Sequence, residues 1–310
     1  MSMSMKKILL LAKKEVTPGV DAAPTALANA ILCRSVTPKP INSETVARDL
    51  VRPYKGNSGK LVSSVHREYE FEVEVAGAGD PGDEPAWGIL LEACGFKKTV
   101  TADTSVVYSP VSEGEPTLTM WAYLDKVLMK MTAAKGTVSM ELNAKAIPVF
   151  RFRFIGEYSA TTDSALPAAV DYTKFVTPLV VGKINTPEFT FMGETVCMSG
   201  FTIDVANDLI YRDLVNCGGP ASPDRTPTGS ATFELTDVAT HAWDEGIRMG
   251  EVGAVSFVHG TISGNIVEID LPAAQPNSLT INDQDKIAMV QVPFDINPVI
   301  GNDEIVVTVR

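Results

Sequence analysis

Apolar and polar residues alternate along several stretches of the chain with the two-residue period of a β-strand. In Glu68–Val75 an aromatic or valine side chain alternates with each of four glutamates. In Pro148–Ile155 three phenylalanines alternate with Arg151 and Arg153. If these strands are neighbours, we expect the two arginines to pair with the glutamates across the sheet. The same reading predicts further strands at Ser105–Tyr108, Thr117–Leu124, Val127–Met131, Thr137–Leu142, Ala231–Leu235, Ala254–His259, Asn265–Leu271, Lys286–Phe294 and Glu304–Val309.

Two short helices interrupt this pattern, and each contains a tryptophan. In the first, Asp83 is expected to cap the helix and Gly95 to end it, so that Trp87 begins a buried stripe with the 3.6-residue period. The second is predicted within Thr240–Met249 and contains Trp243. We expect Trp87 and Trp243 to be core anchors in equivalent positions.

The two halves of the chain resemble each other. Cys33–Val51 and Cys197–Val215 align without a gap at an offset of 164, with six identities in nineteen positions. A chain of 310 residues is also longer than the ~250–300 residues that usually fold around a single hydrophobic core. The sequence therefore predicts a mainly β protein, a tandem duplication of a β-sandwich or half-barrel with one short packing helix per copy. Its parts would be a first domain at 1–160, a linker at 161–182 and a second domain at 183–310.

A long hairpin is expected in the first half only. Val127–Met131 and Thr137–Leu142 flank a turn-like stretch, Thr132–Gly136. An isolated two-stranded arm is marginally stable in water, so we expect neighbouring chains to hold it as an assembly hairpin. Its apolar faces would be formed by Val127, Met129, Met131, Val138, Met140 and Leu142.

Charge is unevenly distributed along the chain. Residues 1–182 contain 20 basic and 20 acidic residues, whereas residues 183–310 contain 6 and 18, so 6 − 18 = −12 is the whole net charge. Stable binding of nucleic acid needs a basic surface, so the acidic half argues against nucleic acid as a bound ligand. The N-terminal stretch Met1–Lys14 is too short in its apolar part for a signal peptide or membrane span, and we interpret it as a short strand or arm.

Candidate catalytic chemistry is sparse. The three histidines lack metal-ligand spacing, the four cysteines include no C-x-x-C pair, and no nucleophile elbow or phosphate-binding loop occurs. The glutamates of Glu68–Val75 are spaced widely enough for an acid–base pair, but four in a row favour a solvated or salt-bridged face. We therefore predict no catalytic, cofactor-binding or metal-binding residues, no cofactor and no enzymatic activity.

A series of segments resembles the major tail tube proteins of long, non-contractile-tailed bacteriophages. Its order and spacing extend over residues 17–158, through the segments 17–25, 29–32, 68–96, 104–111, 123–125, 135–139 and 148–158. The sequence departs from the family at Lys126, where an Asp-Gly turn is common, and at Ala133 and Lys135, where glycine and arginine are expected. These differences affect the turn and the contacts of the predicted hairpin.

The resemblance implies a virion structural protein, made in the bacterial host cytoplasm, that self-assembles into stacked rings. Inner sheets would join around a channel through which double-stranded DNA passes only in transit to the host. Implied partners are the chain itself and the tape-measure, tail terminator and distal tail proteins, with no membrane. A duplicated subunit would need three chains for a ring that single-domain subunits build from six, so we favour trimers over hexamers.

Two alternatives from other classes remain open. One is a β-sandwich module that binds carbohydrate or another ligand, which should expose an aromatic cluster. The other is a different virion protein, either a head–tail connector or the tube of a contractile tail. In the favoured interpretation, the acidic residues of 183–310 line the channel and avoid adhesion to DNA.

Overall fold

The structure is a computed structural model and describes residues 3–310, so Met1 and Ser2 of the expected N-terminal strand lie outside the described residues. The predicted mainly β class is confirmed: the strands pair antiparallel, and two short helices accompany them. The first half contains β1 (Ile8–Lys14), β2 (Ala30–Ile31), β3 (Ser35–Ala47), β4 (Lys60–Glu74), α1 (Gly88–Glu92), β5 (Phe96–Thr101), β6 (Ser105–Pro110), β7 (Leu118–Leu124), β8 (Val127–Glu141), β9 (Val149–Tyr158) and β10 (Thr162–Asp163). Residues 164–187 then contain no helix or strand.

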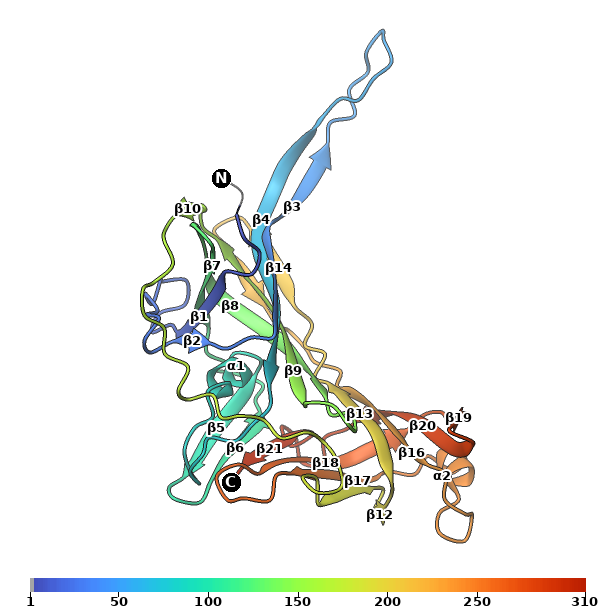
Figure 1. Ribbon diagram of the computed structural model, residues 1–310. Helices are drawn as coiled ribbons and strands as arrows, with labels where there is room; N and C mark the ends of the chain where they lie inside the picture. The colour runs from blue at the N-terminus through green and yellow to red at the C-terminus, as the bar shows by residue number, and fades with distance from the viewer. Residues whose placement is uncertain (1–2) are drawn as a thin grey trace.

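The second half has a similar composition of elements. It contains β11 (Glu188–Phe191), β12 (Glu194–Thr195), β13 (Met198–Asp204), β14 (Ile210–Leu214), β15 (Cys217–Ala221), β16 (Thr228–Glu234), α2 (Trp243–Met249), β17 (Gly253–His259), β18 (Val267–Pro276), β19 (Thr280–Gln284), β20 (Ile287–Ile296) and β21 (Val306–Val309). Figure 1 shows most of the first half in the upper part of the view and most of the second half below it, with β5 and β6 beside the second half and β14 beside the first.

Alternation of side chains explains why these segments form strands. In β4, Tyr69, Phe71 and Val73 are buried, while the glutamates between them face the other side of the sheet. β9 lies beside β4 as expected, with Arg153 opposite Glu70 and Arg151 opposite Glu72. The expected cross-strand ion pairs are confirmed in slightly different form, since Arg153 pairs with Glu68 and Arg151 with Glu72.

The strand order of the first half recurs in the second. The first half pairs its strands in the order β2–β1–β7–β8–β9–β4–β3, and β10 adds to β8. The second half pairs them in the order β12–β11–β17–β18–β20–β16–β13, and β21 adds to β18. β18 and β19 both pair with β20, one after the other along the same edge. The hairpin β5–β6 has no counterpart in this order and joins β21 of the second half.

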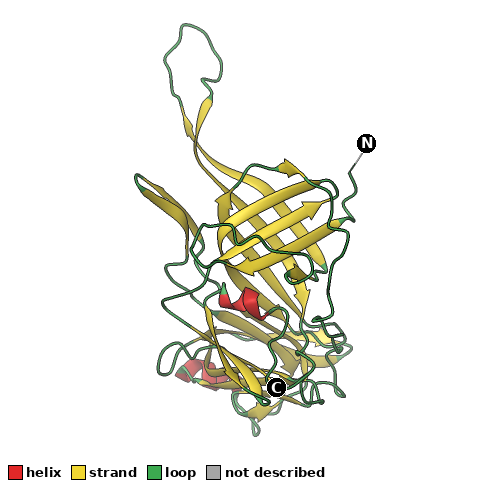
Figure 2. Cartoon of the chain, turned by 90° about the vertical axis from the view of Figure 1, so that its left-hand side faces the viewer, coloured by secondary structure: helices red, strands yellow, loops and turns green. Residues whose placement is uncertain are grey.

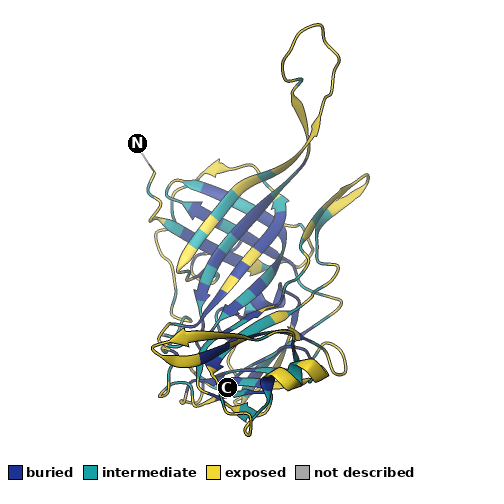
Figure 3. Cartoon of the chain, turned by 90° about the vertical axis from the view of Figure 1, so that its right-hand side faces the viewer, coloured by how far each residue is buried: buried dark blue, intermediate teal, exposed yellow. Residues whose placement is uncertain are grey.

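Both halves also extend a two-stranded arm from corresponding places. In the first half, β3 and β4 form a hairpin that reaches far beyond the rest of the molecule (Figure 1), and Figure 3 shows its tip exposed. In the second half, the hairpin β14–β15 lies between β13 and β16. The matched segments at offset 164 fall at the start of β3 and β13 and, farther along, at the ends of the two arms.

The prediction of a hairpin at 127–142 is wrong. β8 is one continuous strand from Val127 to Glu141, and the turn-like stretch is a bulge at which the register shifts between Thr132 and Lys135. Ala133 has a positive φ of 51° at this bulge, where β7 on one edge of the strand and β9 on the other edge overlap. The named apolar residues therefore do not form an exposed arm. Met129, Met131, Val138, Met140 and Leu142 are buried, and Val127 packs against the core.

The two tryptophans lie in the hydrophobic core, each at the start of a helix. Trp87 donates a hydrogen bond from Nε1 to the Ala76 carbonyl at 2.9 Å, and Trp243 donates one to Thr236 Oγ1 at 2.8 Å. The first helix is shorter than predicted, because α1 has Trp87 rather than Asp83 at its N-cap. Both helices are small beside the sheets that they contact (Figure 2).

Candidate functional surfaces

One sheet runs through both halves of the chain and presents a polar face. Its strands follow one another in the order β3–β4–β9–β8–β13–β16–β20–β19, because β8 of the first half pairs with β13 of the second. Directly opposite residues of antiparallel strands lie on the same face. One row of opposite residues crosses the sheet without interruption: Ser35, Glu72, Arg151, Ser139, Asp204, Thr228, Asp295 and, on β18, Gln275. Every residue of this row is at least partly exposed, so we call this side of the sheet the polar face.

Ion pairs neutralise the basic side chains of the polar face in the first half. Arg153 Nε lies 3.1 Å from Glu68 Oε1, and Lys39 contacts both Glu68 and Glu70. Arg151 lies between two carboxylates, with Nε 3.2 Å from Glu72 and Nη2 3.0 Å from Glu141. Each cation in this cluster is therefore matched by at least one carboxylate.

Glu68 stays ionised within this cluster although it is buried. Burial alone disfavours the charged carboxylate, but hydrogen bonds from Arg153 and Lys39 outweigh this effect and lower the pKa of Glu68 from 4.5 to about 2. The same contacts raise the pKa values of Arg153 and Lys39, chiefly through their hydrogen bonds to Glu68. The cluster thus holds its charges in fixed pairs over a wide range of pH.

In the second half, the carboxylates of the polar face have neutral neighbours. Asp204 lies opposite Ser139 on one side and Thr228 on the other, and Asp295 lies opposite Thr228 and Gln275. Both aspartates are exposed. The polar face is therefore charge-balanced near β4 and β9 and acidic near β13 and β20.

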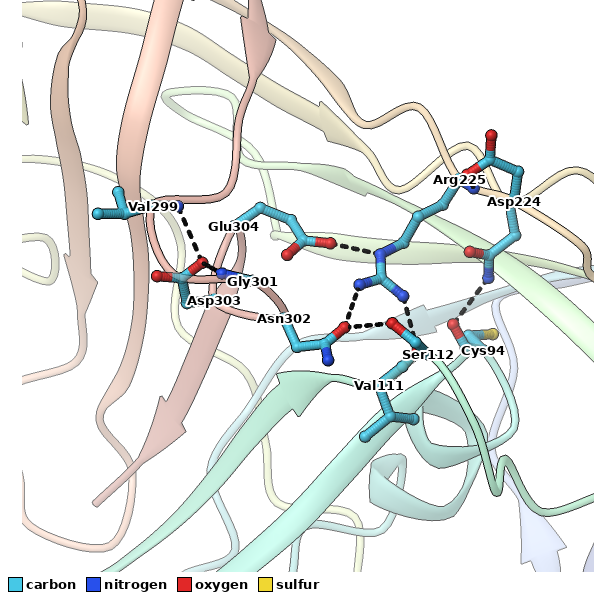
Figure 4. A network of polar contacts seen from close by, with 11 residues as sticks. Cys94, Val111, Ser112, Asp224, Arg225, Val299, Gly301, Asn302, Asp303 and Glu304 are labelled. Atoms are coloured by element: carbon cyan, nitrogen blue, oxygen red, sulfur yellow. Dashed lines mark hydrogen bonds and ion pairs between the residues drawn. The ribbon is translucent and has the colours of Figure 1, made fainter.

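A polar network joins the two halves beside a cavity of about 640 Å³. Arg225 forms an ion pair with the buried Glu304, donates from Nη1 to the Val111 carbonyl at 2.6 Å, and donates from Nη2 to Asn302 Oδ1 at 2.7 Å (Figure 4). The Ser112 hydroxyl donates to the same Asn302 oxygen at 2.7 Å. Val111 and Ser112 come from the first half and the other three residues from the second, so this network fastens the halves together.

The histidines and cysteines are the remaining side chains with possible catalytic or metal-binding chemistry. Over residues 3–310, no group of three or more His, Cys, Asp or Glu side chains is placed to hold a metal ion. The three histidines contact different residues: His66 stacks on Tyr211, the His241 ring is tilted against Trp243, and His259 contacts Thr186 and the Leu179 carbonyl. All four cysteines are free. The helices in the described part of the chain are also too short to cross a membrane.

The exposed apolar residues of the β3–β4 arm were not predicted. Val46, Val51, Tyr54, Leu61 and Val62 are all more than half exposed on this hairpin. Isolated apolar residues at a surface are ordinary, but a group of them on one projecting arm makes the arm a candidate contact surface. The available signal was that these residues lie on either side of a polar, glycine-containing stretch, 55–60, which contains no residue suited to a hydrophobic core.

Comparison with known proteins agrees with this picture. A family model described as phage tail tube protein matches residues 5–298, which is nearly the whole chain. Comparison with individual curated proteins gave no match.

Proposed function

The chain belongs to the phage tail tube protein family, and from this we propose that its copies assemble into stacked rings that form the DNA conduit of a phage tail. The chain is then a structural component of the virion tail rather than an enzyme. The observation that carries the proposal is the polar face, which continues across eight strands and both halves of one chain. A sheet of this kind can line a channel when further copies extend it.

The repeated strand order supports a duplicated tube domain. Each half has a strand pair at the edge, a hairpin with an arm, a short helix with a buried tryptophan, and three further strands in the same order. We propose domains at 1–160 and 183–310, with 161–182 as the linker. Three chains would then supply six such domains to one ring.

The polar face is the natural candidate for the channel wall. A wall rich in unpaired lysine or arginine would hold DNA through counterion release. Here Lys39, Arg151 and Arg153 are ion-paired, and the second half adds exposed carboxylates. Such a wall would let double-stranded DNA pass without adhesion. The tape-measure protein would occupy the same channel before ejection, and terminator and distal tail proteins would close its ends.

Contact between rings is assigned to the β3–β4 arm. The arm projects beyond the body of the subunit, and its exposed apolar residues have no partner surface in their own half. A neighbouring ring would bury them.

Native mass spectrometry and negative-stain electron microscopy of the purified protein test the proposal together. We expect rings with the mass of three 33.2 kDa chains, and tubes at higher concentration. Rings of six chains would refute the trimer while keeping the tube function. Protein that stays monomeric under all conditions would refute self-assembly.

A further inference from the structure

The junction between the two halves of one chain is a short antiparallel ladder. Leu142 N donates to the Phe201 carbonyl and Ala144 N to the Ser199 carbonyl, both at 2.9 Å, and Val205 N donates to Val138 O at 3.1 Å. This ladder joins the C-terminal end of β8 to β13. Within the second half β13 pairs only with β16, so its other edge is the one that β8 occupies. Bonds run in both directions across this junction, as in any antiparallel ladder.

The same sheet ends in two strands with an open edge. Within residues 3–310, β3 pairs only with β4, and β19 pairs only with β20. β3 holds the place in the first half that β13 holds in the second. β19 is the counterpart of the C-terminal end of β8, because β19 pairs with β20 in the second half and the end of β8 pairs with β9 in the first. The two open edges are therefore the counterparts of the two strands that form the junction.

Backbone directions show which groups each open edge presents. Leu235 N donates to Ala288 O, and Ile296 N donates to Pro227 O, so the even-numbered residues of β20 face β16 and the odd-numbered ones face β19. The β19 residues opposite those odd-numbered positions are Thr280, Asn282 and Gln284. The N–H and C=O groups of Ile281 and Asp283 consequently point outward from the sheet.

The β3 edge presents mainly acceptors. Val75 N donates to Pro148 O, so odd-numbered residues of β4 face β9 and even-numbered ones face β3. Ser35, Thr37 and Lys39 lie opposite these even-numbered residues, which leaves the backbone groups of Val36 and Pro38 pointing outward. Proline has a carbonyl but no N–H. Two copies of β3 would therefore pair poorly with each other, whereas a strand that supplies donors fits.

Resting on the proposed self-assembly, we propose that β19 of one copy pairs with β3 of the next copy and repeats the β8–β13 junction between chains. The outward N–H groups of Ile281 and Asp283 would donate to carbonyls of β3, in an antiparallel ladder like the one between β8 and β13. Strand direction alternates across the eight strands, so β19 and the next β3 meet antiparallel without any change of direction. Ile281 lies opposite the buried Val290 yet is 59% exposed, and a neighbouring chain would cover it.

Cysteine cross-linking tests which edges meet. The background carries Cys197→Ser and Cys217→Ser, because both native thiols are exposed. One variant adds Thr37→Cys and the other Asn282→Cys; both positions are exposed and lie on the polar face. On addition of a short bis-maleimide, we expect cross-linked dimers from a mixture of the two variants, and only monomers from each variant alone or from the background.

A second pair of variants tests the donor directly. Ile281→Pro removes an outward N–H and leaves the ladder between β19 and β20 intact, whereas Ile281→Thr keeps the N–H and is the matched control. We expect the threonine variant to form rings and the proline variant to remain monomeric, with melting temperatures within a few degrees of each other. Rings from both variants, or dimers from Thr37→Cys alone, would overturn the pairing while leaving the tube function standing. If the wild-type protein forms no rings, the proposed function fails first.

Discussion

At the scale of single residues, the polar face depends on carboxylates that keep their charge while buried. Glu68 is 2% exposed and accepts hydrogen bonds from Arg153, Lys39 and Asn42. Because its pKa is lowered to about 2, folding favours the ionised form. The stabilisation is fully present above the unfolded pKa of about 4.5 and is lost as pH falls towards 2.

We predict that Glu68→Gln lowers the free energy of unfolding by about 2 kcal/mol at pH 7, because Arg153 and Lys39 lose a charged partner. The difference from wild type should shrink between pH 4.5 and pH 2, because there Glu68 of the unfolded chain binds a proton while Glu68 of the folded protein stays ionised. Urea unfolding at pH 7 and pH 3 measures both effects. Glu74→Gln is the control, since its pairing with Arg34 at 3.9 Å is long and exposed, and it should change stability by less than about 0.5 kcal/mol. A constant difference at both pH values would contradict the assigned role of Glu68.

Arg225 illustrates a different effect, because its partner Glu304 is buried at the junction of the halves. We predict that Arg225→Met destabilises the protein by about 3 kcal/mol, since it leaves a buried carboxylate without its cation. Adding Glu304→Gln should recover part of this loss. A thermodynamic cycle of the two single variants and the double variant, measured by urea unfolding, gives the coupling. Additive losses would mean that the pair is not coupled.

At the scale of elements, the sequence predicted the strands and helices whose formation depends on residues close together in the chain. The alternation in Glu68–Val75 and Pro148–Ile155 located β4 and β9, and the apolar spacing that begins at Trp87 located α1. β3 was missed because Pro38 and Pro40 are unusual in strands; they are tolerated here because β3 is an edge strand.

The error at β8 has a physical cause as well. The stretch Thr132–Gly136 has small residues and a glycine, which suit a turn, and Ala133 does adopt a positive φ. Whether such a stretch reverses the chain or only bulges depends on the strands beside it. β7 pairs with one edge of this strand and β9 with the other, and the two overlap at the bulge, so the chain continues as a strand; this information is not local.

For the β3–β4 arm, we predict that replacing residues 48–59 with a two-residue turn leaves stability unchanged and still permits rings, but prevents tubes. The removed residues make no contribution to the core, so their loss should affect only contacts between rings. Electron microscopy counts tubes, and thermal unfolding checks the fold. A control with Lys55, Asn57 and Ser58 replaced by alanine keeps the arm and should form normal tubes. Tubes from the deletion would remove the arm from ring stacking.

At the scale of the whole molecule, the sequence repeat indicated two related halves but not how they join. The ladder between β8 and β13, the pairing of β6 with β21 and the Arg225 network all connect residues far apart in the chain. No short pattern encodes such contacts, because each strand is compatible with several neighbours. The uneven charge was visible in the sequence, and the structure adds where part of it lies: Asp204 and Asp295 face the same side of the sheet as the paired charges of the first half.

This placement leads to a prediction about the assembled tube. If the polar face lines the channel, Asp204→Lys with Asp295→Lys puts unpaired cations on the wall, and each ring gains several contacts to phosphate. We expect rings of this variant to retain short duplex DNA at 50 mM salt and to release most of it by 200 mM, while wild-type rings retain none. The control Glu113→Lys with Asp163→Lys changes the net charge equally at exposed positions outside the eight strands of the polar face. Fluorescence anisotropy with labelled DNA compares the three proteins. Equal binding by the control would show that total charge, rather than the position of the carboxylates, governs adhesion, and the polar face would then lose its assignment as the channel wall.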